Sequence, residues 1–169
     1  MNPIEVPAPH DTDTDTDPAL GKPDFQDCFE ATVATRGRGA LELALSTFAR
    51  TPRWVNAAMA LRNRVVRFVG LKDLGLLSGV DPARGADSYR VGDRVGIFTI
   101  VAMSHAEVVF GDSDRHLQVR VHVRLSRERP GIVSVTTVVH IRNLLGRLYM
   151  AAVVPMHKRI VPAMLARVA

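Results

Sequence analysis

The sequence predicts an α+β fold in which a curved antiparallel sheet is covered by one long C-terminal helix. A strand-like run over residues 132–141 passes through Asn143 and Gly146 straight into an amphipathic segment over residues 144–168. This arrangement lets the terminal helix fold back over the inner face of the sheet. The other predicted strands of the second half follow one another without intervening helices, which favours antiparallel over parallel pairing.

The first half predicts one strand followed by two short helices. The strand starts at Asp24, because apolar and polar residues alternate from there as far as Val33. Apolar residues at helical spacing predict a first helix over residues 41–48. Thr51 is a candidate N-cap and Gly70 a candidate C-terminal residue for a second helix. The buried stripe of the second helix is expected to contain Trp54, Ala58, Leu61, Val65 and Phe68.

The second half predicts a meander of strands. Gly92-Asp93 resembles a two-residue hairpin turn, strands are expected over 95–103 and 106–110, and residues 111–114 form the next turn. The clearest alternation covers residues 117–125, where Arg120 and His122 are expected to point outward. The residues expected to face the interior there are Leu117, Val119, Val121, Val123 and Leu125.

The chain length predicts a single domain over residues 23–169, preceded by a disordered acidic tail over residues 1–22. The lone Cys28 and an N-terminus without a cationic and apolar leader predict a reduced, cytoplasmic setting. The longest apolar run near the C-terminus, residues 148–156, is far below the roughly 20 residues that span a bilayer, so no membrane span is expected.

Positive charge is abundant but scattered. The net charge is +5, and setting aside the five acidic residues of the tail leaves about +10 on the remainder. The few aromatic residues do not gather beside a basic stretch, as single-strand or RNA binding requires, so a nucleic-acid partner is disfavoured.

Several blocks of the sequence, in order from Asp24 to the C-terminus, resemble the bacterial domain of unknown function family 2867. That family is similar to the START-like, helix-grip superfamily of polyketide cyclase and birch pollen allergen relatives. The resemblance implies a sheet gripping the terminal helix around an apolar cavity, and no established activity. The blocks are Asp24-Phe25-Gln26-Asp27-Cys28-Phe29, Leu61-Arg62-Asn63, Gly70-Leu71-Lys72, Val95-Gly96-Ile97-Phe98, Gly111-Asp112-Ser113-Asp114-Arg115-His116-Leu117, Leu145-Gly146-Arg147-Leu148-Tyr149 and Pro155-Met156-His157.

The resemblance also implies a partner. Members of that family occur alone or fused to a reductase-like dinucleotide-binding domain. This chain has no such domain, because Arg36-Gly37-Arg38-Gly39 lacks the third glycine of the fingerprint. A separate reductase-like protein is therefore one expected partner. Arg142 stands where His or Asn is expected just before Asn143.

Arg62 is the leading candidate for a functional residue. Its helical phase places it in the apolar arc of the second helix, where a charge needs a partner. Its guanidinium would bind a carboxylate or phenolate group of a ligand. The alternative is a structural salt bridge to one of four acids, Asp27, Glu30, Asp112 or Asp114.

Tyr149, His157 and His140 are the other ligand-binding candidates, and their side chains are also able to transfer protons. The alternative for each histidine is an amphipathic side chain at the edge of an apolar stripe. Neither histidine has an acidic partner nearby in the sequence, so no catalytic residue is assigned.

Two further patterns favour structural roles. Asp112, Asp114 and His116 have the spacing of cation ligands, but their residue types are more typical of a turn that caps its own backbone. Cys28 in a strand indicates packing rather than a nucleophile. No metal or cofactor is expected.

The sequence thus predicts a domain that binds a small apolar or amphipathic molecule between the sheet and the terminal helix. Two alternatives remain open. One is an enzyme of cyclase, dehydratase or hydrolase type that uses the same cavity, and the other is an accessory module for a reductase-like protein.

Overall fold

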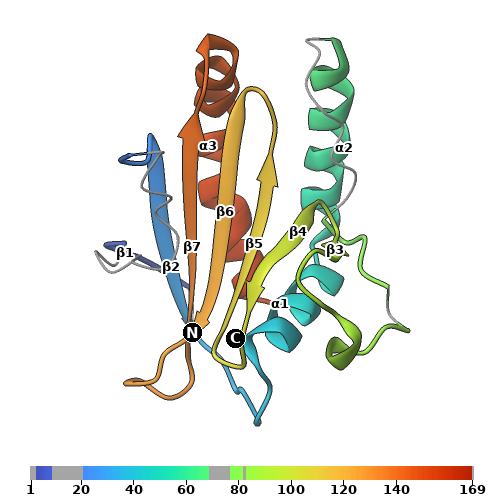
Figure 1. Ribbon diagram of the computed structural model, residues 1–169, viewed down its shortest axis with the longest axis vertical. Coiled ribbons are helices and arrows are strands. Elements are labelled where there is room, and N and C mark those ends of the chain that lie inside the picture. Colours follow the sequence, from blue (N-terminus) through green and yellow to red (C-terminus); the bar gives the residue numbers. More distant parts are fainter. Residues whose placement is uncertain (1–2, 9–20, 69–76, 82, 169) are drawn as a thin grey trace.

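Seven strands form one antiparallel sheet, in the order β1-β2-β7-β6-β5-β4-β3 (Figure 1). The computed structural model describes residues 3–8, 21–68, 77–81 and 83–168, with the backbone alone for residues 65–68. The strands are β1 (Ile4–Val6), β2 (Phe25–Thr32), β3 (Arg94–Val95), β4 (Phe98–Met103), β5 (Glu107–Ser113), β6 (Leu117–Leu125) and β7 (Ile132–Ile141).

Helices cover one face of this sheet, which we call the inner face. The long helix α3 (Leu144–Leu165) starts directly after β7 and runs back behind the sheet (Figure 1). The shorter α1 (Ala40–Ala49) packs on β5, β6 and α3. This is the α+β, helix-grip arrangement that the sequence predicts.

Helix α2 (Arg53–Phe68) buries a different face from the predicted one. Val55 and Asn63 are buried, whereas Trp54 is 44% and Leu61 64% exposed. An apolar arc on a helix does not by itself choose the packed face. Here, the choice follows the contacts of Val55 and Met59 with the core. The side chains of Val65 and Phe68 lie outside the described residues.

The meander differs from the prediction at two turns. Val95 pairs with Phe98, so the two-residue hairpin turn is Gly96-Ile97, with Gly96 at φ 57°, rather than Gly92-Asp93. Strand β5 continues to Ser113, which places Asp112 in a strand instead of a turn. The turn that follows is closed by Asp114, whose Oδ1 accepts hydrogen bonds from the backbone N–H groups of His116 and Leu117.

The alternation of β6 has the predicted phase. Val121, Val123 and Leu125 pack in the core under the helices. His122 lies on the opposite face, as predicted, but it is only 4% exposed. The outward direction of His122 is as predicted, but the side chain is covered, and its ring is hydrogen-bonded to Glu107 of β5.

The N-terminal segment contains a strand that its composition does not predict. Residues Ile4–Val6 pair with Cys28–Glu30 at the edge of the sheet. Lys158 of α3 bonds the Glu5 carboxylate at 2.9 Å. Residues 9–20 of the expected tail lie outside the described residues. In the described ranges, no helix has both the length and the apolar character that crossing a membrane requires.

Candidate functional site

The interior is divided into two apolar clusters, and a small group of polar side chains lies between them. The larger cluster joins α1 to the middle of the sheet, and Phe29, Val135 and Ile160 belong to it. The smaller cluster lies nearer the start of α3 and includes Phe25, Val139 and Tyr149. Asp27 on β2, Thr137 on β7 and His157 on α3 are polar residues that lie between members of these two sets.

We call Asp27, Thr137 and His157 the interior polar site. Asp27 is 5% exposed and stands on β2 between Phe25 and Phe29. Its carboxylate meets His157 of α3, whose Nε2 lies 3.2 Å from Oδ1 and 3.1 Å from Oδ2. Only the contact to Oδ1 has the geometry of a hydrogen bond. A buried carboxylate needs such a partner, because an isolated charge is costly in an apolar interior.

Thr137 is the cross-strand neighbour of Asp27 on the same face of the sheet. Side chains directly opposite in an antiparallel pair have their Cβ atoms about 4.5 to 5.5 Å apart. Thr137 is 4% exposed, and its hydroxyl has no hydrogen-bond partner within the described residues. The same is true of Asp27 Oδ2. Two adjacent buried oxygens therefore retain unused hydrogen-bonding capacity.

Arg62 and Tyr149, predicted separately, lie together. Arg62 Nε donates to the Tyr149 hydroxyl at 3.1 Å, and its guanidinium carbon lies 5.2 Å from the ring centroid. Its Nη1 donates to Asn63 Oδ1 at 2.8 Å. This contact joins α2 to α3 and orients the Tyr149 ring, which packs against the smaller apolar cluster.

His157 is brought to the interior polar site, and His140 is not. The His157 ring packs edge-on against Phe25, with ring centroids 5.9 Å apart. His140 is buried on the outer face of β7, in register with Gln118 of β6. The four candidate residues thus separate into the Arg62–Tyr149 contact, His157 beside Asp27, and His140 on the other side of the sheet.

The outer face carries a charged group of its own, consisting of Glu107, His122 and Arg124. Glu107 Oε1 lies 2.9 Å from Arg124 Nη2 and 3.1 Å from His122 Nδ1. Burial alone would raise the pKa of Glu107. The hydrogen bonds from His122 and Arg124 outweigh it and hold the pKa below its ordinary value. This outer-face cluster stabilises the pairing of β5 with β6.

Cys28 lies on the same outer face and is 1% exposed. Burial raises the pKa of its thiol, and Thr136 donates a hydrogen bond to its sulfur at 3.2 Å. A buried thiol with a raised pKa is a poor nucleophile. The geometry favours a packing role for Cys28, as the sequence indicates.

The residues around Asp114 and His116 hold the start of α3 in place through hydrogen bonds. Arg115 Nε donates to His116 Nε2, so Nδ1 carries the ring proton toward Asn143 Oδ1 at 3.1 Å. The same Oδ1 caps the helix by accepting from Gly146 N–H. A Cβ at Gly146 would lie 2.5 Å from the His116 carbonyl oxygen, so a larger residue does not fit.

That arrangement favours the turn interpretation over a cation site. Both ring nitrogens of His116 are engaged by neighbouring side chains. Among the residues that the structure describes, no group of three or more His, Cys, Asp or Glu side chains is arranged to hold a metal ion.

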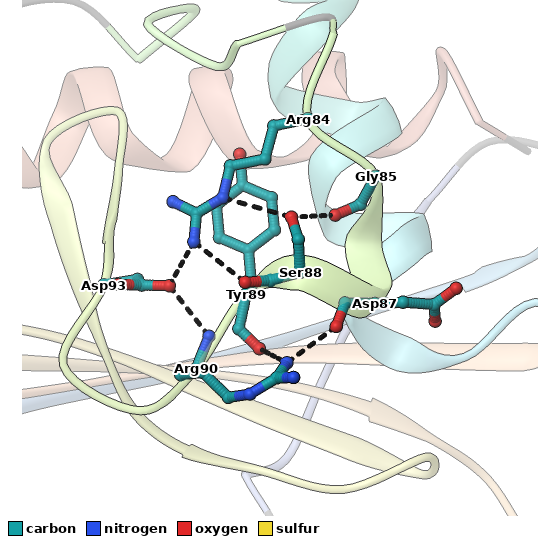
Figure 2. A network of polar contacts seen from close by, with 7 residues as sticks. All are labelled: Arg84, Gly85, Asp87, Ser88, Tyr89, Arg90 and Asp93. Carbon is teal, nitrogen blue, oxygen red and sulfur yellow. Dashed lines mark hydrogen bonds and ion pairs between the residues drawn. The ribbon is translucent and has the colours of Figure 1, made fainter.

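A second polar network occupies the loop before β3 (Figure 2). We call it the loop cluster, and its centre is Arg84. The guanidinium bonds the Asp93 carboxylate, the Ser88 carbonyl at 3.0 Å and the Ser88 hydroxyl at 3.2 Å. It stacks 3.9 Å above the ring of Tyr89. Backbone donation from Arg90, followed by the bond from Arg84, lowers the pKa of Asp93.

Two hollows of about 210 Å³ each lie at the ends of the sheet. Residues of the β6–β7 turn, the β4–β5 turn and the segment before α1 line the first, among them Pro130, His105 and Arg38. The second lies at the start of α3 beside Arg142 and Arg147. Neither is lined by a residue of the interior polar site.

From the sequence, Asp27 is only a possible salt-bridge acid for Arg62, and Thr137 is not a candidate. The signal was present, since Asp27 is in phase with Phe25 and Phe29, and Thr137 is in phase with Val135 and Val139. A polar residue on the apolar phase of a strand indicates a special environment. The contact of Asp27 with His157, 130 residues along the chain, depends on the fold.

Comparison with known proteins gives one result. The family model described as Protein of unknown function (DUF2867) matches residues 19–164. Neither the curated proteins nor the solved structures yield a significant match.

Proposed function

Since the chain belongs to the DUF2867 family, whose function is unknown, we propose a function that is based on the side chains in the interior of the domain. The domain binds a small amphipathic molecule between the inner face of the sheet and α3. The observation that carries this proposal is the interior polar site, a buried carboxylate and hydroxyl beside a partly buried imidazole, placed between two apolar clusters.

The arrangement has the composition of a small-molecule site. Such sites are mostly apolar, with a few polar groups that fix the orientation of the ligand. The two clusters would take the apolar body, and the interior polar site would take the head group. Tyr149, held by Arg62, would border the same space from the α2 side. The similarity to START-like proteins that the family resemblance implies supports the same interpretation.

Native mass spectrometry of freshly purified protein tests this proposal. We expect a co-purifying molecule of constant mass that is lost on denaturation. Filling the site with Thr137→Leu should reduce its occupancy. Ser134→Leu, on the opposite face of the same strand, is the matched control and should retain the molecule. Protein without an adduct that also fails to bind the apolar dye Nile red saturably would contradict the proposal.

A second candidate function, an enzyme of cyclase, dehydratase or hydrolase type, is supported by the His157–Asp27 contact. A carboxylate that accepts from Nε2–H would leave Nδ1 of the neutral ring as a base, and a histidine base oriented by a carboxylate is a recurring arrangement in general acid–base catalysis. The accessory-module alternative has no comparable support in the described residues.

The two candidates differ in what His157→Gln does. For an enzyme, this variant should still bind the co-purified molecule but lose its conversion by at least 100-fold, as expected for removal of a general base. For a binding protein, incubation should leave the molecule chemically unchanged in both proteins. Mass spectrometry of the extracted molecule before and after incubation measures the difference.

A further inference from the structure

We infer that the head group recognised at the interior polar site is a hydrogen-bond donor, an alcohol or an amine, and not a carboxylate or a phosphate. This inference rests on the proposed function and adds the chemical class of the ligand. It follows from which atoms of the site already have partners.

The first step concerns the unused atoms. His157 hydrogen-bonds Asp27 Oδ1 and lies beside Oδ2 as an ion-pair partner, whereas Oδ2 and Thr137 Oγ1 have no hydrogen bond within the described residues. An ionised carboxylate only accepts hydrogen bonds, and a hydroxyl both donates and accepts. The capacity left over is therefore mainly that of an acceptor, which only a donor satisfies.

The second step concerns position. Asp27 and Thr137 are register partners on adjacent strands, and both side chains are more than nine-tenths buried. At the separation typical of a cross-strand pair, one hydroxyl or ammonium group is able to contact both oxygens. Two contacts from fixed strands would orient the head group.

The third step concerns charge. A ligand carboxylate at this place would meet the Asp27 carboxylate, and like charges at close range in a buried site repel strongly. The cationic candidate from sequence analysis, Arg62, directs its described hydrogen bonds to Tyr149 and Asn63. Arg62 thus stabilises the α2–α3 contact, and the acidic ligand that its position suggested in the sequence is disfavoured.

The fourth step concerns the rest of the ligand. Phe25 and Phe29 flank Asp27 on β2, and Val135 and Val139 flank Thr137 on β7. Apolar side chains thus surround the acceptor pair on the inner face. The ligand class that fits is an apolar body with a single hydroxyl or amine.

A matched series on one fluorescent body tests this inference. The four probes are 2-naphthalenemethanol, 2-naphthylmethylamine, 2-naphthoate and 2-methylnaphthalene, titrated against the full chain with a fluorescence readout. We expect the alcohol, the amine or both to bind at least 10-fold more tightly than the acid and the hydrocarbon.

Variants assign the difference to the proposed atoms. Asp27→Asn and Thr137→Val should each weaken the best probe by at least 5-fold, and Ser134→Val on the outer face should leave its affinity unchanged. Thr137→Val alone tests the site if Asp27→Asn does not fold.

The outcomes separate the two proposals. If 2-naphthoate binds most tightly, or if the four probes bind equally and neither variant matters, the head-group inference is overturned while ligand binding stands. The polar pair would then be only structural. If no probe binds saturably to the wild-type protein, the inference and the proposed function both fall.

Discussion

The two polar networks of this domain are organised in opposite ways. The loop cluster gathers residues close together in sequence, Arg84 to Asp93, at the surface. Its guanidinium bonds a carboxylate, a carbonyl and a hydroxyl and also stacks on an aromatic ring. The interior polar site gathers Asp27, Thr137 and His157 from three elements far apart in the sequence, and among the described residues it leaves Asp27 Oδ2 and Thr137 Oγ1 without a hydrogen bond.

The difference separates a structural network from a functional candidate. A local network whose side chains bond one another stabilises its loop and leaves no buried oxygen without a hydrogen bond among the described residues. A buried polar group without a partner costs about 1 to 3 kcal/mol, so an interior that served stability alone would place apolar side chains there. Features that cost stability are most often kept at functional sites. The predictions below test this contrast, from the largest expected effect to the smallest.

The largest effect is expected from His157→Leu. The variant removes the partner of the Asp27 carboxylate, whose side chain is only 2% exposed, and leaves a buried charge uncompensated. We expect a loss of about 3 to 5 kcal/mol in the free energy of unfolding, measured by urea denaturation. The double variant Asp27→Leu/His157→Leu removes both polar groups and should recover most of the loss. A double variant no more stable than His157→Leu would show that the contact itself stabilises the fold.

The start of α3 provides a second local network, in which both the oxygen and the nitrogen of the Asn143 side chain are hydrogen-bonded. Asn143→Ala removes the N-cap of the helix and the bonds to His116 and the Arg115 carbonyl. Loss of an N-cap costs about 0.5 to 2 kcal/mol, and we expect the upper end of that range. Asn143→Asp keeps an N-cap oxygen and should recover about half of the loss in chemical denaturation. Equal losses in both variants would mean that the amide donor, not the cap, carries the effect.

The loop cluster should depend on the planar shape of the Arg84 guanidinium and not only on its positive charge. Arg84→Lys keeps the positive charge but not the planar fork that bonds Ser88 and Asp93 while stacking on Tyr89. We expect a decrease in Tm of about 2 to 4 °C in calorimetry, with ligand binding unchanged. A variant that loses binding as well would connect this loop to the function.

The outer-face cluster predicts a pH effect. The pKa of Glu107 is lowered from its ordinary value of 4.5, so its contribution to stability is complete above that pH and is lost as the pH falls through the lowered pKa. The Tm of the wild-type protein should therefore fall more steeply below pH 4.5 than that of Glu107→Gln. Parallel curves for the two proteins from pH 6 to pH 3 would contradict this assignment.

These networks also show how far the sequence predicts the molecule. The alternation of residues 117–125 and the direct passage from strand to helix at Asn143 carry the fold class, because both signals are local and periodic. The predicted buried face of α2 was wrong, since Leu61 and Trp54 belong to an apolar arc that is exposed. Short polar stretches such as Gly92-Asp93 predict a turn but not its place in the strand pairing.

The candidate site was predicted only in part. Residue type and helical phase identified Arg62, Tyr149 and His157, yet their partners come from other elements. A sequence without an alignment does not show that β2 and α3 meet at Asp27, since that contact depends on the register of β2 with β7 and on the path of α3. Polar residues in the apolar phase of a strand are the one local signal that would have identified Asp27 and Thr137.

The smallest and most discriminating effect is expected from Thr137→Val. The substitution keeps the shape of the side chain and replaces a buried hydroxyl that has no partner in the described residues with a methyl group. If the hydroxyl served the fold, its removal would destabilise the protein. If it is kept for a ligand, the free energy of unfolding of the ligand-free protein should stay constant or rise by up to about 1 kcal/mol, because a desolvated polar group disappears.

Thr136→Val on the outer face is the matched control. Its hydroxyl donates to Cys28, so the same change there should cost about 0.5 to 1.5 kcal/mol, the usual net value of a hydrogen bond. Denaturation of the two neighbouring variants measures the contrast directly, and a larger loss at Thr137 than at Thr136 would show that the interior hydroxyl belongs to the structure.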